Sequence, residues 1–579
     1  MTGYIENSPS ITEMTLKNVR KWKDNEFDQQ FDLAHLNTHT RERVLAILSQ
    51  YKDIFSKHEM DIGLASNLEM EIEVDNTKPR IQKYYPLPHA VREQTKEILD
   101  QMLEYGLLRE CNEPSNFLAN LLVTKKKDGS VRVLLDGRLL NQATIRKATI
   151  MMAPLQIFTS LSNKKFITLI DVSNAFWHIP IKYEHQPYTA FYSEAHGKRF
   201  CYTRAPQGLK NSPVYLHFLM CEMFAPFVKH VIHYADDILI ASDKSIDHHL
   251  RILEKVLHRF QEYNIKLKPA KLEILKPEIE FIGVVWKHGT LNIPQARIQA
   301  FKNLAPPNTP KKTKSMICAL SYYRKFIPNF ADLAKPLMEL AELHPKQFKW
   351  QPQHQQAFEK LILAMQTHTS LNLPIPNETF YIQTDASEVA GAGRIYQLDK
   401  EGNEKLIACV SRTFTKTERK YGIFRKEVLA LLYTLKSLDF FLRYAPKVII
   451  KVDAKSILYL RLCKDSAGIL LRFSLDLSKY EAEIHHVPGA KNEVSDVLSR
   501  QHKDIKDILN ENKQANVLSE KEAETLLKRL IIPDGKKFTP EEVQSLLELE
   551  SLPGPHPKQR KSELKGKKGK KNIKMRPQQ

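Results

Sequence analysis

The feature that most constrains this chain is a pair of adjacent acids inside an apolar hairpin pattern. Tyr234-Ala235-Asp236-Asp237 stands between the apolar runs VIH and ILIA. The alternation of side chains along a strand turns one of the two acids toward a buried face. A buried carboxylate is costly unless a cation or a hydrogen-bond donor compensates it. Surface turns account for most Asp-Asp pairs, but these apolar flanks favour a cation site.

A second acidic position ends an earlier apolar segment. KFITLIDVSNAF is predicted to contain a buried strand that ends at Asp171. An aspartate at a strand end often does no more than cap the helix that follows it. Together with the hairpin acids, however, Asp171 becomes the third carboxylate of one candidate site.

Four further acids occupy the second half of the chain. TFYIQTDASEVAGAG and KVIIKVDAKSI are predicted strands that end at Asp385 and Asp453. GIFRKEVLALLYTL is a predicted helix that carries Glu427, and HHVPGAKNEVSDVLSR places Asp496 in a short helix after a Pro-Gly loop. Any one of them alone is more often a cap or a solvated charge. In this order, strand ends and helices can bring four carboxylates to two Mg²⁺ ions.

Length and periodicity predict a multidomain α/β chain. A length of 579 residues exceeds what one hydrophobic core usually holds. Helices are expected over Val91 to Leu108 and around an amphipathic run from Val44 to Tyr51. Asp128-Gly129 suits the tight turn of a hairpin, and IEFIGVVW is expected to be a single strand. Alternating strands and helices then favour a mixed α/β architecture.

Composition indicates the kind of partner that the chain binds and the compartment in which it works. The formal net charge is +20, and Lys558 to Arg576 hold ten Lys or Arg residues and one Glu. Such a surplus suits a surface that holds a phosphate backbone, although charge alone is weak support. The six cysteines form no CxxC pair, so we expect free thiols in a reducing compartment, without a disulfide framework or a zinc finger. No apolar run is long enough for a membrane span, and the polar N-terminus does not fit a signal peptide.

The two acidic groups and the segments around them resemble a known family. Asp171 followed by Phe176, and the Tyr-x-Asp-Asp hairpin, resemble the palm of a reverse transcriptase. LVTKKKDGSVRVLLDGRLLN resembles its fingers hairpin, APQGLKNSP its nucleotide-lining segment, EFIGVVW its primer grip and SYYRKFIPNF its thumb. The four later acids, ending in the VPG…N…D…LSR pattern, resemble the RNase H of LTR retroelements. From roughly Arg41 to Arg500 the chain resembles the reverse transcriptase and RNase H region of a gypsy-like LTR retrotransposon Pol polyprotein.

The resemblance implies a role for each candidate residue. Two Mg²⁺ ions per site, with Mn²⁺ as a substitute, would be held by seven catalytic carboxylates: Asp171, Asp236, Asp237, Asp385, Glu427, Asp453 and Asp496. Lys126 and Arg132 would grip the incoming triphosphate, Gln207 and Gly208 would line the nucleotide, and Phe176 would exclude a ribose 2′-hydroxyl. The implied activities are RNA- and DNA-templated DNA synthesis and hydrolysis of RNA in RNA–DNA hybrids.

The chain departs from the family pattern at three places. The usual Asp-Tyr-Arg after the fingers is Asp136-Gly137-Arg138 here, and EPSNFLANLLV replaces a stretch of small residues. The loop between the VPG turn and Asn492 is too short for the family's mobile histidine. His485 and His486 lie on the other side of that turn, so no catalytic histidine is assigned.

The fold class implied is a right-hand polymerase of fingers, palm and thumb followed by an RNase H-like mixed-sheet domain. The expected domains are an N-terminal segment at 1–60, fingers and palm at 61–290, a thumb-like helical segment at 291–345, RNase H at 346–502 and a charged, basic, disordered tail at 503–579.

The expected partners are an RNA template, a DNA primer/template, an RNA–DNA hybrid and dNTPs, with a tRNA as candidate primer, a homodimer as candidate assembly and no membrane. We expect a cytoplasmic location in a virus-like particle, with nuclear entry through the basic tail as an alternative. The sequence shows no Asp-Ser/Thr-Gly protease signature and no His-His-Cys-Cys integrase site. The chain is therefore expected to be the middle of a Pol polyprotein or a copy that lost its flanks.

Three functional hypotheses differ in class. The first is an active enzyme, the second a domesticated or inactive retroelement-derived protein that binds nucleic acid, and the third an RNA-templated polymerase of another class. An RNase H segment argues against the third, because copying RNA into RNA leaves no hybrid to degrade. The presence of all seven carboxylates favours the first hypothesis over the second.

Overall fold

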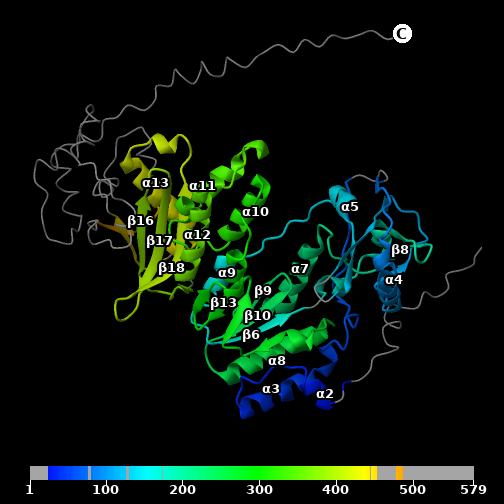
Figure 1. The fold of residues 1–579 in the computed structure, drawn as a ribbon. Coiled ribbons are helices and arrows are strands. Elements are labelled where there is room, and N and C mark those ends of the chain that lie inside the picture. Colours follow the sequence, from blue (N-terminus) through cyan, green and yellow to red (C-terminus); the bar gives the residue numbers. More distant parts are fainter. Residues whose placement is uncertain are drawn as a thin grey trace, which may run out of the picture. The chain divides into compact units, whose positions relative to one another are not determined.

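The computed structural model describes residues 22, 24–75, 80–125, 129–172, 174–368, 370–443, 445–452, 478–480 and 482–486. The chain divides into two compact units, one up to Gly289 and one from Thr290 onward. Figure 1 shows both units and labels many of their elements.

The centre of the first unit is a four-stranded antiparallel sheet. Its strands are β6 (Phe166–Asp171), β9 (Val231–Tyr234), β10 (Asp237–Ser242) and β11 (Leu272–Ile274), in the order β11-β6-β10-β9. The amphipathic helix α8 (Ile246–Glu262) packs against β10, and its Leu253, Val256 and Leu257 are fully buried. Burial of that apolar stripe fixes which face of the sheet is covered. Strands β6, β9 and β10 confirm the buried strand expected in KFITLIDV and the hairpin expected in VIHYADDILIAS.

The N-terminal helices belong to the same core. They are α2 (Asp24–Asp28), α3 (Thr38–Gln50) and the 3₁₀ turn η1 (Lys52–Ile54). Val44 and Leu48 of α3 are fully buried, as their helical spacing predicted. Phe27, Phe31 and Phe55 meet edge to face with ring centroids 5.0–5.5 Å apart. α3 also contacts α8, so this segment packs beneath the central sheet (Figure 1).

The remainder of the first unit consists of short strands and helices. The helices are α4 (His89–Glu104), α5 (Arg138–Ala143), α6 (Pro154–Thr159) and α7 (Ser212–Phe224), and the 3₁₀ turns are η2 (Ala175–His178), η3 (Tyr183–Thr189), η4 (Ala225–Phe227) and η5 (Pro269–Lys271). The strands are β1 (Arg80–Ile81), β2 (Leu108–Glu110), β3 (Phe117–Leu118), β4 (Leu121–Lys125), β5 (Val131–Leu135), β7 (Phe191–Ser193) and β8 (Lys198–Tyr202). β4 and β5 form the hairpin expected around Asp128-Gly129, and Gly129 has a φ of +85°.

One expected strand is wrong in detail. IEFIGVVW forms two strands, β12 (Glu278–Phe281) and β13 (Val284–Lys287), paired as a hairpin. The turn consists of Ile282 and Gly283, both at positive φ (+48° and +68°). A β-branched residue rarely adopts this conformation, so the pattern gave no warning of a turn at Ile282.

The second unit contains a five-stranded mixed sheet. The strands are β16 (Phe380–Ala386), β17 (Ala390–Leu398), β18 (Glu404–Thr413), β19 (Val448–Val452) and β20 (Ala482–His486), in the order β18-β17-β16-β19-β20. β16, β19 and β20 run parallel, and β17 and β18 are antiparallel to their neighbours. The other elements are α9 (Gln295–Lys302), α10 (Pro310–Ser321), α11 (Phe330–Glu342), α12 (Pro352–Thr367), α13 (Ile423–Ser437), α14 (Asp439–Leu442), β14 (Thr290–Asn292), β15 (Ser370–Asn372), η6 (Pro345–Gln347) and η7 (Glu418–Lys420).

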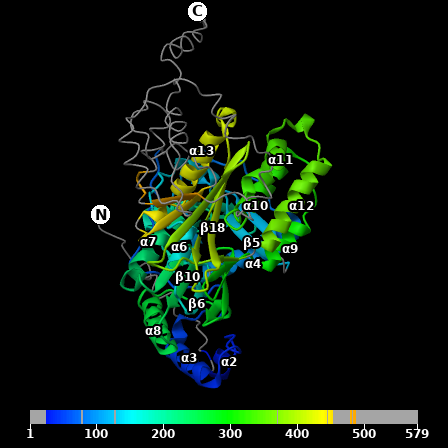
Figure 2. The same cartoon turned by 90° about the vertical axis from the view of Figure 1, so that its left-hand side faces the viewer.

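Helices cover both faces of this sheet (Figure 2). A Cβ placed on Gly391 would meet Ala430 of α13 at 2.8 Å, and one on Gly393 would meet Thr434 at 2.2 Å. Only glycine allows α13 to approach the strand so closely. Ser411 pairs with Ala392 and so lies on the opposite face, where its hydroxyl accepts from the Ala331 N–H of α11 at 3.1 Å.

Of the helices in the described ranges, none has both the length and the apolarity needed to cross a bilayer.

Candidate active sites

Strand register assembles the first carboxylate group. Asp171, the last residue of β6, pairs directly with Asp237, the first residue of β10. Asp236 occupies the two-residue turn between β9 and β10, and its carbonyl accepts from the Val172 N–H at 3.0 Å. Asp171 and the adjacent pair Asp236 and Asp237, more than sixty residues later, therefore converge at one end of the sheet. The turn begins with Ala235 at a φ of +54°, a conformation that residues with a side chain seldom adopt and that is typical of functional sites.

The electrostatics of this group favour a cation. Burial and the neighbouring carboxylates of Asp236 and Asp171 raise the pKa of Asp237 to about 6. The Lys271 ammonium opposes this rise in the pKa of Asp237, and its Nζ lies 2.6 Å from Asp171 Oδ1. The site thus holds more negative charge than Lys271 balances. Hard oxygen donors at close range are the ligand set that Mg²⁺ prefers, so these residues fit a divalent ion.

The residues expected to touch the nucleotide lie in varied environments. Phe176 is half-buried in η2 and packs against the core of the unit. Gln207 is half-buried, and Gly208 is exposed at a φ of +97° with its carbonyl accepting from Asn141 Nδ2 at 2.7 Å. Arg132 is exposed on β5, whereas Lys126 lies outside the described residues.

Asp136 and Arg138 form an ion pair although glycine, not the family's tyrosine, stands between them. Asp136 is fully buried, and its carboxylate accepts from Arg138 Nε at 2.8 Å and Nη2 at 2.6 Å. This pairing is the main reason the pKa of Asp136 is lowered. Gly137 has an ordinary φ of −75°, and a Cβ there would meet its neighbours at 3.4 Å. A glycine is therefore not required between the acid and the arginine.

Of the second acidic group, Asp385 and Glu427 lie among the described residues. Asp385 lies near the end of β16, and Glu427 lies in α13, as expected from their segments. Thr434 packs over Gly393 and Ala430 over Gly391, and these glycines pair with Thr384 and Ala386. Because Glu427 precedes Ala430 by about one turn on the same helix face, it lies toward the edge where β16 ends. Parallel pairing brings the end of β19, at Val452, to that same edge.

Two expected ligands of the second group, Asp453 and Asp496, lie outside the described residues. His485 and His486 are in β20, and His485 Nε2 lies 3.2 Å from Glu483 Oε2.

Lys271 was missed by sequence reasoning. It stands in the short turn before β11, and β11 pairs with β6, which carries Asp171. A single lysine in LKPAKLEI gives no signal by itself, because only the strand pairing shows its partner.

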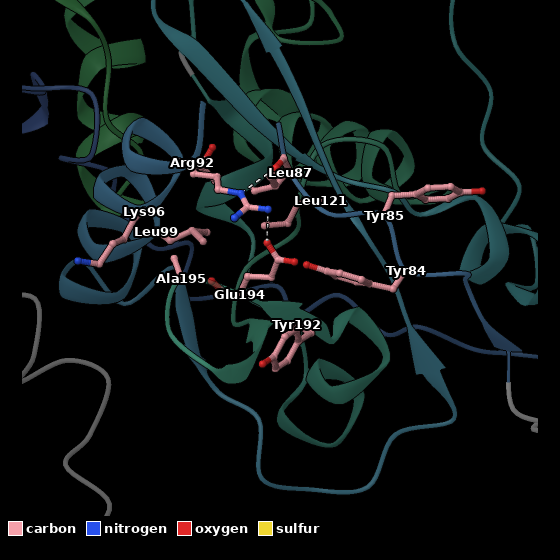
Figure 3. A pocket seen from close by; sticks show the side chains of 12 residues that line it. Tyr84, Tyr85, Leu87, Arg92, Lys96, Leu99, Leu121, Tyr192, Glu194 and Ala195 are labelled. Atoms are coloured by element: carbon pink, nitrogen blue, oxygen red, sulfur yellow. Dashed lines mark hydrogen bonds and ion pairs between the residues drawn. The ribbon is translucent and has the colours of Figure 1, made fainter. Parts of the chain in front are cut away.

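A separate cavity of about 110 Å³ lies between α4 and β7. Figure 3 shows that Arg92 and Glu194 occupy its middle, with Arg92 Nη2 3.1 Å from Glu194 Oε2. Tyr84 also points toward Glu194, and burial together with this carboxylate raises the pKa of Tyr84 to about 12. None of the five expected carboxylates in the described ranges lines this cavity, and the ion pair of Arg92 and Glu194 is part of its lining.

The fold and the paired strands define a reverse transcriptase palm followed by an RNase H-like domain. Residues 124–286 match the family model of the reverse transcriptase (RNA-dependent DNA polymerase). Residues 350–450 match the model of the RNase H-like domain found in reverse transcriptase. The fold class expected from the sequence is thereby confirmed.

Within that class, the relatives include Pol polyproteins of transposons. The chain is 29% identical over 503 residues, 86% of its length, to the retrovirus-related Pol polyprotein from transposon 297 of Drosophila melanogaster. It is 26% identical over 449 residues to the Pol polyprotein from transposon gypsy of the same fly, covering 74% of this chain and 42% of that protein. The resemblance to the reverse transcriptase and RNase H region of a gypsy-like LTR retrotransposon is confirmed.

Solved structures show the same fold. A foamy viral protease-reverse transcriptase in complex with dsDNA has a TM-score of 0.72 at 24% identity, covering 82% of this chain and 98% of that one. Among sequence relatives, the chain covers 46% of the transposon 297 protein and 47% of the transposon opus protein, so it spans about half their length.

Proposed function

We propose that the chain is an RNA- and DNA-templated DNA polymerase with an RNase H activity that serves retrotransposon replication. The observation that carries the proposal is the register of β6 and β10, which pairs Asp171 with Asp237 and leaves Asp236 in the adjoining turn. This geometry lies inside the segment that matches the reverse transcriptase model. An inactive nucleic-acid-binding copy has no observation in its favour.

At the polymerase site the protein supplies position and charge. Enzymes of these families generally depend on divalent metals. Two Mg²⁺ ions, with Mn²⁺ as a substitute, would activate the primer 3′-hydroxyl and neutralise the leaving pyrophosphate. Asp171, Asp236 and Asp237 would hold them, while Lys271 offsets part of the negative charge when the site is empty of cations. Phe176 would close the space beside the sugar, and Gln207 and Gly208 would line the nucleotide.

The RNase H site would lie at the end of the sheet where β16 and β19 end. Asp385 and Glu427 lie toward the edge where β16 and β19 end, and Asp453 directly follows β19 in the sequence. With Asp496 they would form the four-carboxylate set that hydrolyses the RNA strand of a hybrid.

The proposed partners follow from these activities. They are an RNA template, a DNA primer/template, an RNA–DNA hybrid and dNTPs, with a tRNA as the primer and a homodimer as the assembly. Two similar foamy viral structures were solved with dsDNA and with an RNA/DNA hybrid. We further propose location in cytoplasmic virus-like particles, with nuclear entry through the basic tail.

Primer extension on an RNA template with dNTPs and Mg²⁺ tests the polymerase, and cleavage of a labelled RNA–DNA hybrid tests the RNase H. Asp236→Asn should reduce synthesis at least about 10³-fold and spare RNA cleavage, because a site that has lost one ligand no longer positions its ions. Glu427→Gln should do the reverse. Asp243→Asn, beyond the opposite end of β10, and Glu401→Gln, in an exposed turn, are the matched controls.

Loss of both activities in either folded variant would contradict two separate sites. Absence of synthesis by the folded natural sequence would instead favour a nucleic-acid-binding protein.

A further inference from the structure

A cluster of soft and borderline metal ligands lies outside both acidic groups. His217 and Cys221 are four residues apart on α7, so they project from the same face of the helix. His233 comes from β9, which packs against α7. One ligand atom from each residue can be chosen so that all three lie within 4.8 Å of one another.

The spacing of the three side chains is close to that of a tetrahedral centre. Cys221 Sγ is 3.5 Å from His217 Nε2 and 3.7 Å from His233 Nε2, and His233 Nε2 is 3.2 Å from His217 Nδ1. Zn–S and Zn–N bonds of about 2.3 and 2.0–2.1 Å at tetrahedral angles separate ligand atoms by roughly 3.3–3.6 Å. These contacts use both nitrogens of His217, so an ion would take one of them and draw together three ligand atoms that already lie within 4.8 Å of one another.

We propose that His217, Cys221 and His233 form a Zn²⁺ site with one coordination position open to solvent. Thiolate and imidazole ligands select Zn²⁺ over Mg²⁺, which prefers oxygen. Cys221 is exposed and both histidines are half-buried, so an ion can reach the three ligands from solvent.

The protonation states needed are accessible. Burial and the neighbouring His217 lower the pKa of His233 to about 4, so its ring is neutral and has a lone pair for a metal. Burial raises the pKa of the Cys221 thiol, so the free side chain keeps its proton. Binding forms the S–Zn bond, breaks the S–H bond and releases that proton to solvent.

The position of the cluster connects a bound ion with the polymerase carboxylates. His233 directly precedes the Tyr234-Ala235-Asp236-Asp237 turn, and α7 begins a few residues after Gln207 and Gly208. A bound ion would join these two segments more firmly than the contacts of His233 with His217 and Cys221 do. The site would therefore stiffen the support of the polymerase carboxylates without contributing to them.

Cobalt titration tests the site in the full chain. The reduced protein is freed of metals and titrated with Co²⁺ in excess Mg²⁺, which occupies the carboxylates but competes poorly for sulfur. Thiolate-to-cobalt charge-transfer absorption should grow until about one equivalent of Co²⁺ per chain has been added, because the proposal is for one site. Its intensity should be that of one sulfur ligand. Cys221→Ser should abolish this absorption and His217→Ala should weaken binding at least about tenfold. Cys318→Ser, which changes the other exposed cysteine in the described residues, should leave it unchanged.

A second measurement needs no variant. Zn²⁺ should slow alkylation of Cys221 at least tenfold, roughly the loss of free thiolate expected on binding, while Cys318 in the same molecule reacts as before. Absence of the absorption in the folded natural sequence, its persistence in Cys221→Ser, or equal alkylation of Cys221 with and without Zn²⁺ would each overturn the proposal.

Discussion

In the first unit the acids come from neighbouring strands of one antiparallel sheet, whereas in the second they come from a strand, a helix and segments further along the chain. Asp171 and Asp237 are placed by backbone hydrogen bonds between β6 and β10. Glu427 is placed by side-chain packing, because the approach of α13 depends on Gly391 and Gly393. The polymerase site should therefore resist changes in packing, and the RNase H site should be sensitive to them.

The largest difference is expected from Gly393→Val. The new Cβ would fall 2.2 Å from Thr434 Oγ1, so α13 must move away from β17. Overpacking of this kind costs about 1–3 kcal/mol and would displace Glu427 along with the helix. RNA cleavage should fall at least about tenfold, since a small displacement of a catalytic group has such effects, while primer extension stays within about twofold.

Limited proteolysis and both activity assays would measure this effect. The control is Gly422→Ser, because a Cβ there meets nothing within 4 Å and the residue precedes α13 at an ordinary φ of −60°. Equal loss of the two activities would mean that the units do not fold as independently as their separate packing indicates.

A smaller effect is expected from Lys271→Met. Removing the ammonium 2.6 Å from Asp171 leaves three carboxylates without their nearby cation. Mg²⁺ should then bind more tightly, lowering the concentration for half-maximal synthesis a few-fold, while the metal-free protein loses at most about 1 kcal/mol. The control is Lys276→Met, which removes an ion pair with Asp32 that is also 2.6 Å long but lies away from the hairpin. This variant should leave the Mg²⁺ dependence unchanged. A rise in the Mg²⁺ requirement would show instead that Lys271 acts on the substrate.

Sequence reasoning located the acids better than it located their neighbours. The strand ending at Asp171, the hairpin around Asp236 and the helix of Glu427 were all predicted, because apolar periodicity and turn chemistry are local signals. The Ile282-Gly283 turn was missed, because the preference of isoleucine for strands concealed it. Lys271 and the cluster of His217, Cys221 and His233 were missed for another reason. Their members meet only through strand pairing and helix–strand packing, which one sequence does not reveal.

The smallest effect concerns stability. It distinguishes a carboxylate that other carboxylates surround, Asp237, from one that a lysine pairs, Asp32. The pKa of Asp237 is raised to about 6, so its ionised form destabilises the folded protein above that pH, and the penalty fades as pH falls from 6 toward 4. Asp237→Asn should raise the melting temperature in EDTA by roughly 1–2 °C at pH 8 and by nothing near pH 4. Asp32→Asn should act in the opposite direction, because hydrogen bonding to Lys276 lowers the pKa of Asp32 and stabilises its ionised form. A lower melting temperature for both variants at pH 8 would mean that Lys271 already balances the three carboxylates. The case for a cation at the end of β6 and β10 would then rest on geometry alone.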